Sequence, residues 1–166
     1  MAKCGPNSDE AIEQVYVQPG ESHLLQRPAV IRTVLGSCVG VTFRSERLGV
    51  SALCHPMLPR APGHVRNAVS GGRRYVDFAI EEMIWRLDKL GAERHELEVK
   101  LFGGGDVLSV SLASRRATVG ALNIDAALEV AARAGLRVVA SSLGGIRGVH
   151  IQFDTRSGEV QLRRLG

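Results

Sequence analysis

The sequence predicts one domain of the α+β class, a mixed layered α/β arrangement, on three observations. Runs of β-type residues come first, two helical segments with a strand between them follow, and further strands end the chain. A strictly alternating parallel fold is disfavoured because the strands gather at both ends of the chain. A chain of 166 residues suits one domain with a buried core. We expect residues 1–14 to be a flexible tail and residues 15–166 to form the domain.

The first half is expected to be mostly strand, since short runs rich in β-branched residues alternate with polar turns. The expected strands are Val15–Val17, Ala29–Val34, Val39–Arg44 and Leu48–His55. Three prolines and a glycine then interrupt regular structure, so residues 56–72 are expected to form a long loop. Loops of this length often carry function.

The second half begins with a helical pattern, in which apolar residues recur at spacings of three and four. This pattern predicts a helix over residues 75–90, ended by Gly91, and a second over residues 123–134, ended by Gly135. The remaining expected strands are Glu98–Phe102, Arg137–Ser141, Val149–Phe153 and Glu159–Arg163. Ser157-Gly158 is a hairpin signal between the last two.

The composition excludes several classes of protein. No apolar run is long enough for a membrane span, and the N-terminus lacks the apolar core of a secretory signal. We therefore expect a cytoplasmic protein with no membrane insertion. The cysteines Cys4, Cys38 and Cys54 form no C-x-x-C pair, so neither a metal site nor a redox motif is expected. The net charge of +4 is scattered and aromatic residues are few, which disfavours nucleic-acid binding but suits an acidic protein partner.

One cysteine and one histidine form a candidate catalytic pair. Cys38 ends a Gly-Ser-Cys turn before one strand, and His55 closes the next strand. A hairpin with Arg44 opposite Gly49 gathers the apolar residues of both strands on one face. They are Val39, Val41 and Phe43 on one strand and Cys54, Ala52 and Val50 on the other. This register puts Cys38 directly opposite His55, about 4.5–5.5 Å apart at Cβ, on a face of small residues that a substrate can approach.

The chemistry of this pair follows from its residue types. A neighbouring imidazole can take the thiol proton, which makes Cys38 the candidate nucleophile and His55 the base. Thr33 is the nearest polar residue that could orient the histidine. Gly36 lets the turn aim the amides of Ser37 and Cys38 at a developing oxyanion. The alternative is that the cysteine and histidine are merely packed together, which is common for buried cysteines.

Several ordered motifs resemble the CheD family of chemoreceptor glutamine deamidases in bacterial chemotaxis. The resemblance spans roughly residues 15–165. The matching segments are Thr33–Val39, His55–Pro59, Arg74–Asp77, Lys100–Gly104, Gly144–Gly148 and Phe153–Thr155 with Gly158. The stretch Gly120–Asn123 departs from the family pattern, and we expect it to bear on partner binding rather than on chemistry.

The resemblance implies hydrolysis of receptor glutamine side chains to glutamate, with the family's triad carried by Cys38, His55 and Thr33. It implies a fold similar to the catalytic domain of the cytotoxic necrotising factor toxins, with no metal or organic cofactor. The implied partners are the cytoplasmic helices of a chemoreceptor and a CheC-type phosphatase. Two alternatives stay open. One is a regulatory module that binds these partners with little catalysis, and the other is a receptor methylesterase of the same fold.

Overall fold

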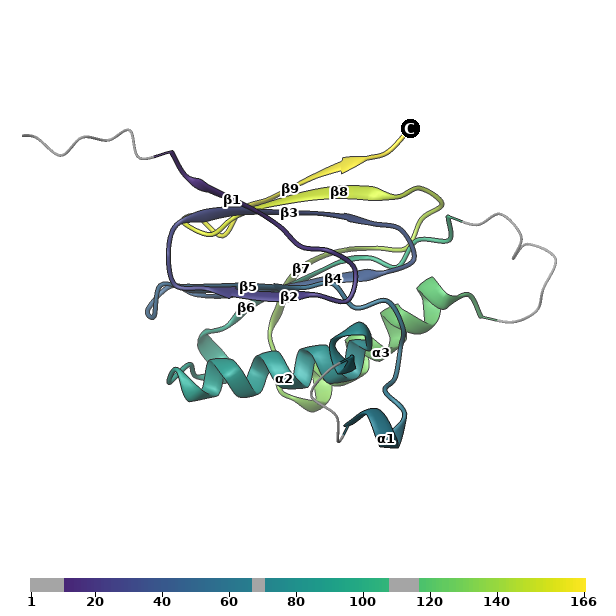
Figure 1. Cartoon of the computed structure of the whole chain (residues 1–166), viewed down its shortest axis with the longest axis horizontal. Helices are drawn as coiled ribbons and strands as arrows, with labels where there is room; N and C mark the ends of the chain where they lie inside the picture. The colour runs from purple at the N-terminus through teal and green to yellow at the C-terminus, as the bar shows by residue number, and fades with distance from the viewer. Residues whose placement is uncertain (1–10, 67–70, 108–116) are drawn as a thin grey trace, which may run out of the picture.

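Two β-sheets stack face to face, and two helices cover the outer face of one of them (Figure 1). The structure is a computed structural model, and it describes residues 11–66, 71–107 and 117–166. The molecule is thus a layered α+β domain, as the sequence predicts. The expected tail over residues 1–14 falls largely on residues 1–10, which lie outside the described residues. No helix in the described part of the chain has the length and apolar character needed to cross a membrane.

The four-stranded sheet has the order β1-β3-β8-β9. Its strands are β1 (Glu13–Tyr16), β3 (Ala29–Leu35), β8 (Val149–Asp154) and β9 (Val160–Arg164). The first two strands pair in parallel and the other neighbours are antiparallel. The β8–β9 hairpin confirms the turn predicted at Ser157-Gly158.

The five-stranded sheet has the order β2-β5-β4-β6-β7. Its strands are β2 (Ser22–Leu25), β4 (Val39–Ser45), β5 (Val50–Cys54), β6 (Glu98–Gly103) and β7 (Val138–Leu143). The long helices α2 (Val76–Lys89) and α3 (Val119–Arg133) lie against it (Figure 1). The short helices are α1 (Gly63–Arg66), η1 (Gly72–Arg74) and η2 (Arg94–Glu96). The middle strand, β4, is buried along its whole length, and it follows directly on Cys38.

Two apolar layers hold these elements together. Alternate residues of β4, among them Val41 and Phe43, point to the helices and pack with Ile80 and Val130. The intervening face meets the four-stranded sheet, where Leu53 packs in one cluster with residues of β3 and β8. Both faces of the central sheet are therefore buried.

The predicted β4–β5 register is wrong by two residues, because Val41 rather than Val39 lies opposite Cys54. The four-residue hairpin loop is present but occupies residues 46–49. A shift of two keeps every side chain on its predicted face, so the apolar pattern alone cannot detect it. The expectation that the second face is open to substrate is also wrong, since the other sheet covers it.

Three further expectations need correction. Strand β2 was not predicted, and residues 56–72 contain the one-turn helix α1 rather than only loop. Helix α3 begins at Val119 instead of Asn123, because Thr118 caps it by accepting a hydrogen bond from the Ala121 amide.

Candidate active site

The turn that carries Cys38 crosses from β3 in one sheet to β4 in the other. It is held by a glycine-rich segment at the end of β6. The Gly105 amide donates to the Gly36 carbonyl at 2.8 Å, and the Gly104 amide donates to the Cys38 carbonyl at 2.7 Å. The Cys38 side chain is half-buried and packs at the margin of the layer between the sheets. The nucleophile candidate is therefore fixed through its backbone while its side chain keeps some exposure.

Glycine is required where this segment touches the turn. Gly103 and Gly104 have φ angles of +88° and +68°, which side-chain-bearing residues rarely adopt. A Cβ atom on Gly103 would also lie 2.4 Å from the Cys38 carbonyl oxygen. The three successive glycines thus form a close backbone contact with the Cys38 turn.

His55 follows directly on β5 and is only 1% exposed. Its backbone is fixed on both sides, since its amide donates to the Glu21 carbonyl at 2.9 Å and its carbonyl accepts from the Gly20 amide at 2.7 Å. Both partners belong to the segment that leads into β2. The unpredicted strand β2 therefore contributes to the position of the histidine.

The hydrogen bonds around Thr33 determine which ring nitrogen of His55 carries the proton. The Thr33 hydroxyl donates to the Val17 carbonyl at 2.7 Å, and it lies 2.7 Å from His55 Nδ1. Because that hydroxyl has only one proton, it must accept from Nδ1–H. The Val17 carbonyl also lies 3.5 Å from Nδ1 and can only accept. His55 Nε2 therefore carries the free lone pair, and it has no hydrogen-bond partner among the described residues.

Cys38 and His55 are diagonal neighbours rather than directly opposed residues. The Val39 amide donates to the Pro56 carbonyl at 3.3 Å, which continues the β4–β5 register beyond the strands. In that register His55 lies across from Gly40, and Cys38 lies across from Met57. Diagonal pairs on one face of an antiparallel ladder are about 7–8 Å apart at the backbone, which is still within reach of a histidine ring. The predicted direct opposition is wrong, but the shared face is retained.

Burial favours the neutral form of both groups. It raises the pKa of the Cys38 thiol, an effect partly offset by the residue's own amide. It also lowers the pKa of His55, against the smaller opposing effects of the Val17 carbonyl and the Glu21 carboxylate. The resting pair is thus a thiol and a neutral imidazole. Such a thiol requires a base to accept its proton during attack.

The predicted oxyanion donors lie in the same turn. Other described residues donate hydrogen bonds to the carbonyls of Gly36, Ser37 and Cys38, but no other described residue accepts one from the Ser37 or the Cys38 amide. Two adjacent amides beside a nucleophile suit a developing negative charge. Their role stays a prediction, as do the roles of Cys38, His55 and Thr33.

Asn123, the fifth residue of α3, contacts the site and was not among the predicted site residues. Its Nδ2 donates to the Ser37 carbonyl and to the Met57 carbonyl, both at 2.9 Å. The residue is fully buried, so the expectation that it bears on partner binding is wrong for this side chain. A signal was present in the sequence, because Asn123 lies on the same helix face as Ala127 and Val130 and is polar among apolar residues.

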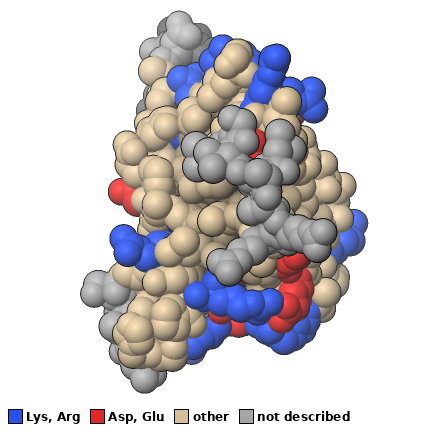
Figure 2. All heavy atoms as spheres, turned by 90° about the vertical axis from the view of Figure 1, so that its right-hand side faces the viewer, with Lys and Arg blue, Asp and Glu red and all other residues tan. Residues whose placement is uncertain are grey.

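A cavity of about 340 Å³ is lined by the end of β7, by residues 144–147 of the β7–β8 loop, and by Val149 and Arg164. The Gly145 carbonyl accepts from the Asp106 amide at 2.7 Å, next to the Gly105–Gly36 hydrogen bond. Arg147 and Arg164 line this cavity and form no ion pair with any described residue. Basic side chains, with some acidic ones among them, lie around the edge of the face at this end of the molecule (Figure 2).

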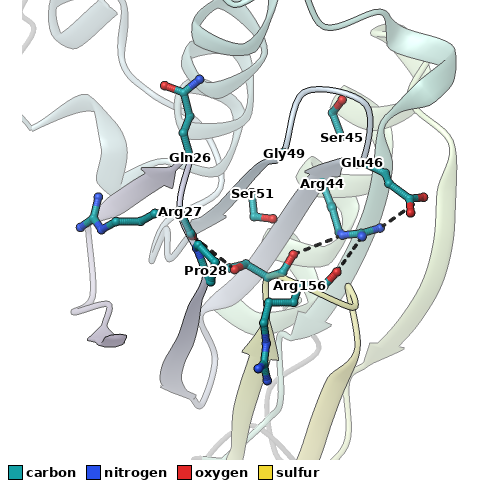
Figure 3. A pocket seen from close by; sticks show the side chains of 10 residues that line it. Gln26, Arg27, Pro28, Arg44, Ser45, Glu46, Gly49, Ser51 and Arg156 are labelled. Carbon is teal, nitrogen blue, oxygen red and sulfur yellow. Dashed lines mark hydrogen bonds and ion pairs between the residues drawn. The ribbon is translucent and has the colours of Figure 1, made fainter. Parts of the chain in front are cut away.

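A second cavity, of about 350 Å³, lies at the opposite end of the sheets, beside the β4–β5 turn (Figure 3). Its arginines are already engaged. Arg44 donates to the carbonyls of Thr155 and Arg156, and the Arg156 side chain pairs with Asp154. Within residues 11–66, 71–107 and 117–166, no group of three or more acidic, histidine or cysteine side chains could hold a metal ion.

Comparisons with known proteins agree on one family. A family model described as CheD chemotactic sensory transduction matches residues 57–164. The "Probable chemoreceptor glutamine deamidase CheD 2" of Geobacter sulfurreducens is 42% identical over 154 residues, which cover 93% of this chain and 91% of that protein. A "Probable chemoreceptor glutamine deamidase CheD" of Maridesulfovibrio salexigens is 38% identical over 164 residues, covering 96% of each.

Among solved structures, the Bacillus licheniformis hypothetical protein YfiH matches 74% of this chain with a TM-score of 0.48 and 10% sequence identity. This chain covers 50% of the length of that structure.

Proposed function

This chain belongs to the CheD family, and on that premise we propose that it is a chemoreceptor glutamine deamidase. The reaction is hydrolysis of a glutamine side-chain amide to glutamate and ammonia. Cys38 is the proposed nucleophile, His55 the base, and Thr33 the group that orients the base. The amides of Ser37 and Cys38, in the turn that begins at Gly36, are the proposed oxyanion donors.

The tautomer of His55 is the observation that supports its role as the base. The Thr33 hydroxyl, held by the Val17 carbonyl, leaves the proton of His55 on Nδ1 and the lone pair on Nε2. A base in this tautomer accepts a proton through Nε2, on the ring edge away from Thr33. Nothing among the described residues competes for that lone pair. This supports a histidine poised to deprotonate a neighbouring thiol.

The first half-reaction forms a thioester. His55 Nε2 takes the Cys38 proton as the sulfur attacks the carbon of the glutamine carboxamide. The negative charge that develops on the amide oxygen is stabilised by the two turn amides. The carbon–nitrogen bond then breaks, and Nε2–H protonates the leaving group, so ammonia departs.

The second half-reaction consumes water. His55 Nε2 takes a proton from water as its oxygen attacks the thioester carbon. The carbon–sulfur bond breaks, and the proton returns from Nε2 to the sulfur. Glutamine and water have then become glutamate and ammonia, and the enzyme is restored without a metal or organic cofactor.

The proposed substrate is the cytoplasmic helical region of a chemoreceptor, which sets a cytoplasmic location. The basic side chains at the edge of this face suit an acidic helical partner, as do Arg147 and Arg164 of the β7–β8 cavity, which form no ion pair with a described residue. Binding of a CheC-type phosphatase is a further proposal, which co-purification of the two proteins tests.

The purified protein and its Cys38→Ala variant should be incubated with the cytoplasmic domain of a receptor from the same organism. Mass spectrometry should detect glutamine-to-glutamate conversion with the wild type and none with the variant. If the wild type binds the receptor but leaves it unchanged, the regulatory-module function replaces the deamidase. If the product is a carboxylate formed from a methyl ester instead, the methylesterase replaces it.

A further inference from the structure

The amide of Asn123 links the two segments that carry the proposed nucleophile and base. Its Nδ2 donates to the carbonyl of Ser37, which precedes Cys38, and to the carbonyl of Met57, two residues after His55. We propose that Asn123 is a positioning residue that holds Cys38 within reach of His55. This inference rests on the proposed function for its catalytic consequence, but not for the geometry that it describes.

The chemistry of the two acceptors explains why the residue is an asparagine. Both are backbone carbonyls and can only accept, so the group between them must donate twice. A primary amide does so without charge, and exchanging its oxygen and nitrogen would set three oxygens against one another. Asn123 Oδ1 is buried and has no partner among the described residues. The two hydrogen bonds that Nδ2 donates therefore explain why an amide occupies this position, although its buried Oδ1 accepts none from a described residue.

These bonds act where the β4–β5 ladder ends. Among the described residues, the Val39–Pro56 hydrogen bond is the other link between the Cys38 turn and the segment that follows His55. Because Cys38 and His55 are diagonal neighbours, a small shift of either segment changes their separation. A displacement of about 1 Å at a reacting group can lower the rate on the order of a hundredfold.

The first turn of α3 is fixed tightly enough to serve as an anchor. A Cβ atom on Gly120 would lie 2.5 Å from the Gly104 carbonyl oxygen, so the helix contacts the glycine segment directly. Gly104 in turn donates its amide to the Cys38 carbonyl. The Cys38 turn is thus held from two sides, by Asn123 at Ser37 and by the glycine segment at Gly36 and Cys38.

The test uses Asn123→Leu, which keeps a similar shape and removes both donors. Val130→Ala is the matched control, because Val130 is buried on the same helix but packs only in the apolar layer. One readout is kcat and KM on the receptor domain. The other is the rate of Cys38 alkylation by iodoacetamide at neutral and at alkaline pH, read on the Cys38 peptide by mass spectrometry, with His55→Ala as the reference.

For Asn123→Leu we expect kcat to fall on the order of ten- to a hundredfold with KM little changed. The ratio of neutral to alkaline alkylation rates should move towards that of His55→Ala, because the thiol loses its base. Val130→Ala should lower thermal stability and leave both readouts of the folded protein at the wild-type value. If Asn123→Leu does not fold, Asn123→Ser carries the same test with one donor retained.

A wild-type alkylation ratio and a wild-type kcat in the folded variant would overturn the positioning role and leave Asn123 a structural residue. If the wild-type protein fails to deamidate the receptor, the proposed function fails. The alkylation ratio then still decides whether Asn123 aligns the pair.

Discussion

At the scale of single residues, Thr33 shows how a buried hydroxyl can select a tautomer. It lies between the Val17 carbonyl and the His55 ring, and it is fully buried. An apolar residue of the same shape would leave the Nδ1 proton with only the longer contact to the Val17 carbonyl. The position of one proton on His55 therefore depends on a side chain from the other sheet.

Thr33→Val should lower kcat for receptor deamidation about tenfold or more, because the base loses the hydroxyl that orients it. Thr33→Ser keeps the hydroxyl and should retain most of the activity. Steady-state kinetics with both variants check this. Equal activity in the valine and serine variants would remove the orienting role from Thr33.

The neutral resting pair predicts a particular pH dependence of stability. His55 has a lowered pKa in the folded protein, so below about pH 6.5 the unfolded chain binds a proton that the native state does not, and stability falls with decreasing pH. Cys38 has a raised pKa, so stability falls as pH rises past about 8.5, where the unfolded thiol ionises first.

Urea unfolding across this pH range measures both effects. His55→Leu should flatten the acid side of the stability curve. Cys38→Ala should reduce the alkaline slope only in part, because burial also raises the pKa of Cys54 to about 12 and that thiol contributes in the same direction. If the free energy of unfolding of His55→Leu falls with decreasing pH as steeply as that of the wild type, groups other than His55 cause the loss of stability in acid.

At the scale of elements, the glycine segment after β6 determines where the nucleophile turn lies. Gly104 combines a positive φ with a close contact, since an added Cβ would lie 2.4 Å from Ile124. Gly91, at the end of α2, has a φ of +84° but no neighbour within 4 Å of an added Cβ. Substituting alanine at each position therefore distinguishes the cost of backbone strain alone, at Gly91, from the cost of strain plus a steric clash, at Gly104.

Gly91→Ala should cost about 1–2 kcal/mol of stability through backbone strain and leave deamidation unchanged. Gly104→Ala should cost more and also lower kcat, because the alanine methyl pushes α3 away from the Cys38 turn. Thermal unfolding and kinetics on both variants provide the comparison. If both variants lost the same amount of stability and kept the wild-type kcat, the clash at Gly104 would have no effect on the Cys38 turn.

Most elements could be predicted from the sequence because their apolar spacing is clear, as in α2 and β4. Strand β2 could not, since it has only four residues and buries its first and last rather than alternate ones, so no strand period marks it. The predicted β4–β5 register was wrong by two residues, because a shift of two residues leaves every side chain on the same face of the sheet. Thr33 and His55 were expected to meet and do so at 2.7 Å. Asn123 was missed because its role depends on carbonyls distant in the sequence.

At the scale of the whole molecule, Arg44 ties the two sheets together at the end away from Cys38 (Figure 3). It extends from β4 and donates to the Thr155 and Arg156 carbonyls in the β8–β9 turn, and it also pairs with Glu98 at 3.3 Å. The side chain is nearly buried, so these donors replace water that the guanidinium has lost.

Arg44→Leu should destabilise the fold by about 2–3 kcal/mol, because two turn carbonyls lose a charged donor. Arg156→Ala is the control. Its side chain is half-exposed, and its backbone carbonyl still accepts from Arg44, so less than about 1 kcal/mol is expected. Chemical denaturation measures both, and similar values would mean that the link between the sheets contributes little.

The proposed contribution of Asn123 to the site also bears on when, during synthesis, deamidation can begin. Translation delivers Thr33, Cys38 and His55 first, while the helix that carries Asn123 is made much later. A growing chain on the ribosome therefore has the proposed nucleophile before it has the helix that is proposed to align it. On the proposed roles, we therefore expect deamidation by a nascent chain to stay on the order of ten- to a hundredfold below that of the finished protein until α3 has been made and packed.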